Sequence, residues 1–486
     1  MTLNIYYVLY ALLVFVYILN RRDTNIFFIK LLIISFLTND LLRIAEFDFV
    51  KNYLLFFYKD FALILLTLCS IYYYLLKRKF NIDKYIVFFL IFFTSIILLS
   101  HNFDMTKKNI LIILSGIYEF IFYPFIIILL LTTFKLDINK FEKFFLSINI
   151  FLFFILIIQI IDPNIYLRYF FNVEPTNQLN WYLKELLFQG KWTSNESDVL
   201  IVVPSIIFSN PGRYGHYILV NFLICLFLCI RKKSYINFLS IFISTILVFY
   251  SSQRASIYLS IFSLFIIFLS KENIFYFIKK INSNKKIIAF FICLLILNIV
   301  FVKKNNEAIY IQVTNKIYNT FEPLVLSFNK KHTNGPESFS GRVLMSLNGV
   351  NDIYLNDNNS LKQMLLGNGF GIHSLGTKTI LKKIYNEEYK YREDFFYEQK
   401  LATLLYDSGI SGLLIYFYFF AYLYFKVNKK TKKFPYIVKR YFFVIIAIPI
   451  ILLHTGYQFY GDYIFQFFYF FLIGMILNYP KNLKKN

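Results

Sequence analysis

The sequence is dominated by a succession of long apolar segments, and these constrain the fold more than any other feature. A helix needs about 20 mostly apolar residues to cross the roughly 30 Å hydrocarbon core of a bilayer. Because hydrophobic residues make up 58% of the chain and charged residues only 16%, a water-soluble surface is excluded. We therefore predict an all-α, polytopic transmembrane helical bundle of about 12 to 14 spans. The candidate spans are 3–20, 25–43, 53–76, 85–100, 109–133, 145–161, 215–230, 235–251, 255–270, 287–302, 402–425, 441–455 and 460–478.

Basic residues are distributed unequally between the two sides of this bundle. Placing alternate connections in the cytoplasm puts 27 Lys and Arg residues there, against 5 in the short connections on the other side. Positively charged segments translocate poorly, so the bias sets the orientation. The net charge of +23 is then a consequence of topology. No nucleic-acid partner is expected, because nucleic-acid binding needs the charges together on one folded face.

Two long polar segments lie on the outer side of this topology, and we expect the working surface of the protein to face outward. The sequence predicts five parts in chain order. They are N-terminal transmembrane helices (1–161), an outer loop (162–214), further transmembrane helices (215–302), a large outer loop (303–400), and C-terminal transmembrane helices with a cytoplasmic tail (401–486). The first apolar segment lacks the basic start and the small-residue cleavage site of a signal peptide, so it is expected to remain as a span.

Three outer arginines are the candidate binding residues. Arg213 lies in NPGRYGH before a span, Arg254 in the tight turn SSQRAS, and Arg342 in SGRV of the large loop. Guanidinium is permanently charged and binds phosphate through paired hydrogen bonds. Other roles stay open for each: lipid phosphate for Arg254, plain solvation for Arg342, and helix capping or an acidic partner for Arg213.

Metal and nucleotide sites are not indicated by the sequence. Cys225 and Cys229 share a helix face, but no His or carboxylate accompanies them, so buried small side chains are expected. The glycines of 366–371 follow no strand, which predicts a turn and not a nucleotide loop. We predict neither a metal nor a cofactor.

The outer location limits the chemistry. Because ATP is not available outside a bacterial inner membrane, synthesis there needs a pre-activated donor such as a sugar on a polyprenyl pyrophosphate. Fixed arginines stabilise the negative charge of that leaving group without a metal. A nearby carboxylate can take the proton from the attacking sugar hydroxyl.

The order of the motifs resembles the O-antigen polymerase/ligase family. NPGRYGHY, SSQRAS, SGRV, LLGNGFG and YEQKLATLLYDSGISGLL follow one another on one side of the membrane, within roughly residues 200–480. The resemblance implies a GT-C-type fold and metal-independent glycan transfer from undecaprenyl pyrophosphate. It also implies that Arg254 and Arg342 bind the pyrophosphate, with Arg213 as a further match. Glu398 stands where ligases place a histidine, which favours the polymerase branch with Glu398 as the general base.

The resulting prediction is a Wzy-type polysaccharide polymerase of O-antigen or capsule, in a bacterial inner membrane with a periplasmic active face. Its expected partners are an undecaprenyl-pyrophosphate-linked oligosaccharide and a chain-length-regulating membrane protein. An O-antigen ligase is the first alternative, and a lipid-linked oligosaccharide flippase or transporter is the second. Flippases tend to carry charges inside the bundle. Here the charges within spans are few: Lys30, Asp40, Lys59 and Asp60.

Overall fold

The computed structural model describes a set of separate stretches of the chain, and every regular element in them is a helix. This confirms the all-α prediction for the described part of the chain. The described residues are 24–45, 63, 84–103, 106–123, 137–161, 206–208, 211–251, 254–268, 299–305, 310–311, 314, 360–372, 377, 381, 385, 400–430, 436–454 and 462–482.

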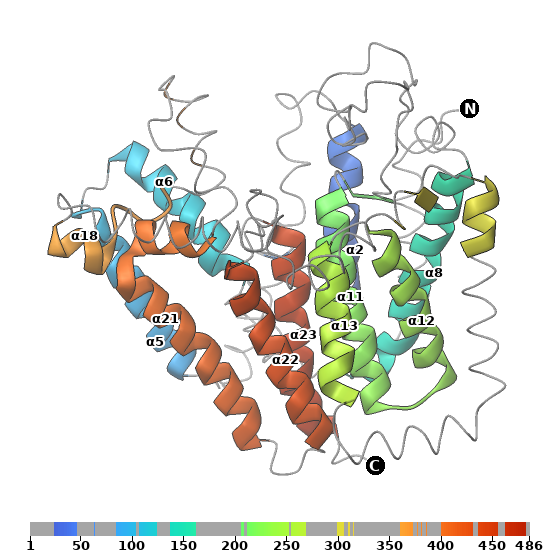
Figure 1. The fold of residues 1–486 in the computed structure, drawn as a ribbon. Helices are drawn as coiled ribbons and strands as arrows, with labels where there is room; N and C mark the ends of the chain where they lie inside the picture. Colours follow the sequence, from blue (N-terminus) through green and yellow to red (C-terminus); the bar gives the residue numbers. More distant parts are fainter. Residues whose placement is uncertain are drawn as a thin grey trace, which may run out of the picture. The chain divides into compact units, whose positions relative to one another are not determined.

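The described helices are shown in Figure 1, and all of them except the short helix Leu361–Leu366 overlap a predicted span. Three of them contain stretches long and apolar enough to cross a membrane: Asn139–Ile161, Gly212–Arg231 and Thr403–Asn428. The predicted spans 3–20, 53–76 and 287–302 lie largely outside the described residues, so the span count stays a prediction. The long elements are α2 (Thr24–Ala45), α5 (Lys84–Ser100), α6 (Lys107–Ile117) with the π-helical turn η1 (Tyr118–Phe122), α8 (Asn139–Ile161), α11 (Pro211–Arg231), α12 (Tyr235–Tyr250), α13 (Arg254–Phe268), α21 (Lys400–Lys430), α22 (Tyr436–His454) and α23 (Tyr463–Asn482).

The chain divides into two compact units, each built from two distant segments. Unit 1 comprises Met1–Tyr72 and Phe134–Val325 and contains α2, α8, α11, α12 and α13. Unit 2 comprises Tyr73–Thr133 and Leu326–Asn486 and contains α5, α6, α21, α22, α23 and the short helix α18 (Leu361–Leu366). The five predicted parts follow membrane topology instead of compactness, and they remain a prediction.

In unit 1, α11 packs against α8, α12 and α13. All of its side chains from Tyr214 to Leu228 are buried. A helix that is apolar around its whole circumference is expected in such a central position. Helices α8, α12 and α13 are thereby arranged around α11.

A polar network joins three helices of unit 1. The Asn149 Nδ2 of α8 donates to the Ser240 Oγ of α12 at 2.9 Å and lies 3.2 Å from the Cys225 Sγ of α11. The Asn221 Nδ2 of α11 donates to Asn149 Oδ1. All four side chains are buried. Hydrogen bonds between helices fix the register of apolar surfaces that would otherwise slide past one another. Cys225 is therefore buried, as predicted, and is also hydrogen-bonded, whereas Cys229 is only partly buried, so the prediction for that residue is wrong.

In unit 2, a kink in α21 receives the glycine-rich loop of 366–371. Gly409 has φ 62° and ψ −169° within the helix, and Gly367 at the end of α18 has φ 79°. The Asn368 N–H donates to the Tyr406 carbonyl at 2.8 Å. The predicted turn is confirmed, since the Gly367 N–H caps α18 by donating to the carbonyl of Gln363.

The same loop is held on its other side by α5 and α6. Ser100 Oγ accepts from the Phe370 N–H at 3.2 Å, and His101 Nε2 donates to the Phe370 carbonyl at 2.9 Å. A Cβ added at Gly116 of α6 would lie 2.7 Å from the Gly371 Cα, so the two backbones touch. The loop thus links α18 and α21 to helices about 270 residues earlier in the chain.

Candidate functional site

The structure places Arg213 and Arg254 at the first turns of two neighbouring helices. Arg213 is the third residue of α11 and is half-buried, and Arg254 is the first residue of α13. The buried Ser256 Oγ donates to the carbonyl of Gly215 at 2.7 Å. Because Ser256 and Gly215 each lie two residues after one of the arginines, this bond brings the two helix starts side by side. Only the backbone position of Arg254 is described.

The last turn of α12 completes this end of unit 1. The Tyr214 hydroxyl of α11 donates to the carbonyl of Leu247 at 2.7 Å. The Ser251 side chain caps α12 by donating to the Val248 carbonyl, also at 2.7 Å. The start of α11 is therefore fixed against both α12 and α13.

The chain that enters α11 is also anchored. The Phe208 ring stacks on the ring of Tyr217, with centroids 5.2 Å apart and planes at 30°. The Ile206 N–H donates to Gln159 Oε1 near the end of α8 at 3.2 Å. Buried aromatic pairs and a buried amide acceptor leave this segment little freedom. The backbone that carries Arg213 is therefore held in place by these contacts.

The electrostatics of this end favour an anion. The unsatisfied N–H groups of a helix start carry partial positive charge. Two adjacent helix starts that each carry an arginine therefore add their positive electrostatic potentials. Among the residues of unit 1 whose side chains are described, the carboxylates are those of Asp137 and Glu142, both at the start of α8. Glu142 binds Arg231, which lies at the opposite end of α11 from Arg213.

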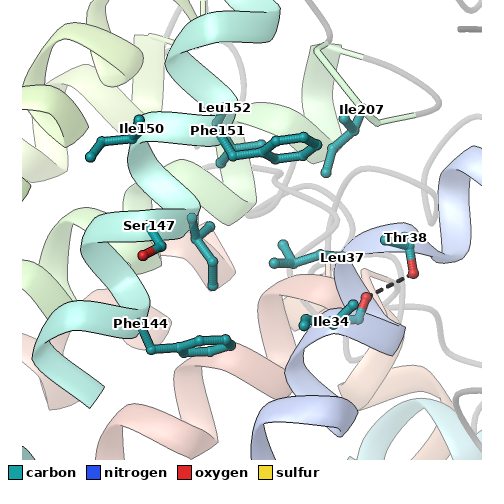
Figure 2. Close-up of a pocket in the computed structure, with 10 residues that line it drawn as sticks. Ile34, Leu37, Thr38, Phe144, Ser147, Ile150, Phe151, Leu152 and Ile207 are labelled. Carbon is teal, nitrogen blue, oxygen red and sulfur yellow. Dashed lines mark hydrogen bonds between the residues drawn. The ribbon is translucent and has the colours of Figure 1, made fainter. Parts of the chain in front are cut away.

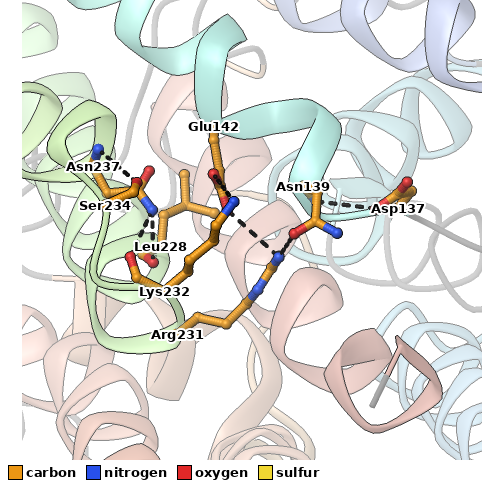
Figure 3. Close-up of polar contacts among 8 residues, drawn as sticks. All are labelled: Asp137, Asn139, Glu142, Leu228, Arg231, Lys232, Ser234 and Asn237. Carbon is orange, nitrogen blue, oxygen red and sulfur yellow. Dashed lines mark hydrogen bonds and ion pairs between the residues drawn. The ribbon is translucent and has the colours of Figure 1, made fainter. Parts of the chain in front are cut away.

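That opposite end carries the basic turn predicted to be cytoplasmic (Figure 3). Glu142 Oε1 lies 3.5 Å from Arg231 Nη2, and Glu142 Oε2 lies 3.4 Å from Lys232 Nζ. Arg231 also donates to Asn139 Oδ1. The Asn237 side chain donates to the carbonyl of Lys232 at 2.9 Å and closes the turn. In unit 1, the basic turn paired with Glu142 therefore lies at the opposite end of α11 from Arg213 and Arg254.

The other two predicted site residues, Arg342 and Glu398, lie outside the described residues. Glu398 precedes the first residue of α21, Lys400, by two positions. The convergence of all four residues on one pyrophosphate therefore stays a prediction. Within the described residues, the structure brings Arg213 next to the helix start of Arg254 and joins the loop of 366–371 to the kink at Gly409.

Sequence reasoning missed two residues of interest. Ser256 lies inside the SSQRAS motif, but nothing in its spacing indicates Gly215 as its acceptor. Asp407 is fully buried beside the kink of α21, within a helix apolar enough to cross a membrane. An ionisable group at such a position is costly and is by default a functional candidate. Its place in YDSG, between apolar residues and a glycine, is the signal that identifies it.

Comparison of the chain with protein-family models, with curated proteins and with solved structures finds no match. Among the described residues, no group of three His, Cys, Asp or Glu side chains is placed to hold a metal ion. The geometry of the residues themselves is then the basis for a functional assignment.

Proposed function

We propose that the protein is a polysaccharide polymerase of a bacterial inner membrane. It transfers a growing glycan from undecaprenyl pyrophosphate onto the sugar of an incoming lipid-linked repeat unit. The observation that carries the proposal is the adjacency of the Arg213 and Arg254 helix starts, joined by the bond from Ser256 to Gly215. The proposal further includes a GT-C-type fold, a periplasmic active face and a chain-length-regulating partner.

Pyrophosphate binding is the first task in this proposal. Arg254 and Arg342, with Arg213, donate paired hydrogen bonds to the phosphate oxygens. Two helix starts add their partial positive charge to the same region. Because packing fixes the starts of α11 and α13 against each other before the donor binds, little reorganisation of these helix starts accompanies the build-up of negative charge on the leaving group.

Proton transfer is the second task, and we assign it to Glu398. The carboxylate takes the proton from the attacking sugar hydroxyl, and the hydroxyl oxygen bonds to the anomeric carbon of the growing glycan. The bond between that carbon and the pyrophosphate oxygen breaks, and its electron pair leaves with undecaprenyl pyrophosphate. The products are a glycan longer by one repeat unit and the free lipid carrier.

The test is a set of alanine variants in cells that depend on this protein for surface polysaccharide. Arg254→Ala, Arg342→Ala and Glu398→Ala are each expected to reduce the product to single repeat units while the protein still inserts. Loss of one pre-positioned donor typically lowers a rate by about 10²–10³-fold. Arg254→Lys keeps the charge but loses the paired geometry, so an intermediate length distribution is expected. Long chains persisting in all three alanine variants would refute the assignment.

Arg440 supplies a matched control. It is a half-buried arginine of α22 on the side predicted to be cytoplasmic. Arg440→Ala is expected to leave the length distribution unchanged, because it cannot reach a periplasmic pyrophosphate.

The identity of the accumulated product separates the alternatives. Single repeat units attached to lipid A indicate a polymerase. Full-length polymer retained on undecaprenyl pyrophosphate indicates a ligase, and precursor retained on the cytoplasmic face indicates a flippase.

A further inference from the structure

An apolar cavity of about 340 Å³ lies between α2 and α8 of unit 1 (Figure 2). The two helices form its sides, with Phe144 and Ile34 toward one end and Ile207 toward the other. Nearly all of the lining is aliphatic or aromatic. The lining residues are Ile34, Leu37, Thr38, Phe144, Ser147, Ile148, Ile150, Phe151, Leu152 and Ile207.

The two hydroxyl groups in this lining donate their hydrogen bonds to backbone carbonyls and not into the cavity. Thr38 Oγ1 donates to the Ile34 carbonyl at 2.8 Å, and Ser147 Oγ donates to the Lys143 carbonyl at 2.9 Å. Each bond is made within its own helix. A chain of methylene groups therefore meets no polar atom that it would leave unpaired.

Three lysines each precede a lining residue of this cavity by about one helical turn. On α8, Lys140 and Lys143 precede Phe144 and Ser147 by four residues, the spacing that places side chains on one helix face. On α2, Lys30 precedes Ile34 by the same spacing. The Lys30 Nζ lies 5.0 Å from the centroid of the Phe144 ring, which directly joins a cation to the lining of the cavity.

The carboxylate of Glu142 is close to these lysines in the sequence but pairs with residues of α11 and the turn after it. Glu142 is buried on the side of α8 that contacts α11, where it pairs with Arg231 and Lys232. Asp137 accepts from the Asn139 N–H and caps the start of α8. Of the described carboxylates near the start of α8, Asp137 therefore contacts the helix start and Glu142 contacts the basic turn.

The length of the cavity matches one leaflet of a bilayer. From Lys143 to Leu152, α8 rises about 14 Å at 1.5 Å per residue. One half of the hydrocarbon core is about 15 Å thick. A lipid whose phosphate lies at the lysines would therefore place its chain along the cavity as far as the middle of the membrane.

We propose that this cavity binds one anionic phospholipid of the cytoplasmic leaflet. Lys30, Lys140 and Lys143 hold its phosphate, and one acyl chain lies between α2 and α8. The location follows from the charge bias that assigns the starts of α2 and α8 to the cytoplasmic side. The phosphate-binding part of this site is separate from the polymerase proposal, since the starts of α2 and α8 lie at the other end of unit 1 from Arg213.

The test measures lipid retention by the full-length protein in mild detergent, using native mass spectrometry. Phosphatidylglycerol and phosphatidylcholine of identical acyl chains are added separately. The wild type is expected to retain one phosphatidylglycerol at roughly tenfold lower lipid concentration than phosphatidylcholine, and K140Q/K143Q is expected to abolish that preference. The control K303Q/K304Q changes two exposed lysines at the end of the predicted span 287–302 and is expected to keep it.

A second pair of variants tests the chain-binding part of the cavity. Ser147→Phe fills the space between α2 and α8 and is expected to prevent retention of phosphatidylglycerol. Ser95→Phe is the control, because the exposed Ser95 of unit 2 makes the same bond within its helix, to the Ile91 carbonyl. Equal retention of both lipids by the wild type would overturn the proposal, as would retention unaffected by Ser147→Phe.

Discussion

Replacing Gly409 by alanine tests a tightly constrained backbone position in the described part of unit 2. Its φ of 62° and ψ of −169° fall in a region that is essentially restricted to glycine. A Cβ there would lie 2.5 Å from the carbonyl carbon and oxygen of Leu365 and 2.7 Å from the Gly367 nitrogen. These are backbone atoms, so no side chain can rotate away to make room.

Two penalties add in this variant. Holding a non-glycine residue in such a conformation costs about 1–3 kcal/mol. Forcing an additional methyl group into a packed site costs about 1–3 kcal/mol more. We expect Gly409→Ala to lower the free energy of unfolding by about 2–6 kcal/mol.

The assay is unfolding of the purified protein by SDS in mixed micelles. Ser408→Ala is the matched control, since it changes the adjacent residue and removes only the 2.6 Å bond from Ser408 Oγ to the Leu404 carbonyl. That variant is expected to cost about 1 kcal/mol or less. If Gly409→Ala unfolds within about 1 kcal/mol of the wild type, the close packing of the glycine loop against the kink does not contribute as argued. Under the proposed function, the same variant also shortens the polysaccharide, because the kink directs the helix start that follows Glu398.

Three further predictions concern unit 1, each measured in the same unfolding assay. Asn149→Leu removes the hub of the buried polar network and is expected to cost about 1–3 kcal/mol, and an unchanged stability would contradict its role in joining the helices. Glu142→Gln removes the charge that pairs with Arg231 and is expected to lower the free energy of unfolding by about 3 kcal/mol. This loss should depend little on salt, because Glu142 is only 4% exposed. A loss that vanishes in high salt would indicate a surface pair. Ser256→Ala is expected to cost about 1 kcal/mol and to shorten the polysaccharide without preventing insertion, because the Gly215 carbonyl loses the donor that aligns the two helix starts. Full-length product from Ser256→Ala would show that this alignment does not matter for transfer.

The sequence by itself predicts the helical class and most helix positions. The spans 215–230, 235–251 and 255–270 each differ from α11, α12 and α13 by only a few residues at either end. This succeeds because apolar length is a local property, and a bilayer imposes it on every spanning helix independently. The turn at Gly367 was predictable for a similar reason, since a glycine after a short apolar helix is a local signal.

The tertiary structure decided which residues meet. Ser256 and Gly215 are 41 residues apart, and Asn149 and Cys225 are 76 apart, yet each pair is hydrogen-bonded. The kink at Gly409 was not predicted, because its cause is the backbone of a loop more than 30 residues earlier in the chain. Hydropathy and charge can be summed along the chain, so they predict the positions of helices in the sequence and their orientation in the membrane. Register, kinks and pairing depend on side-chain shape across interfaces between apolar helices, and the pattern of one helix carries no information about its neighbour.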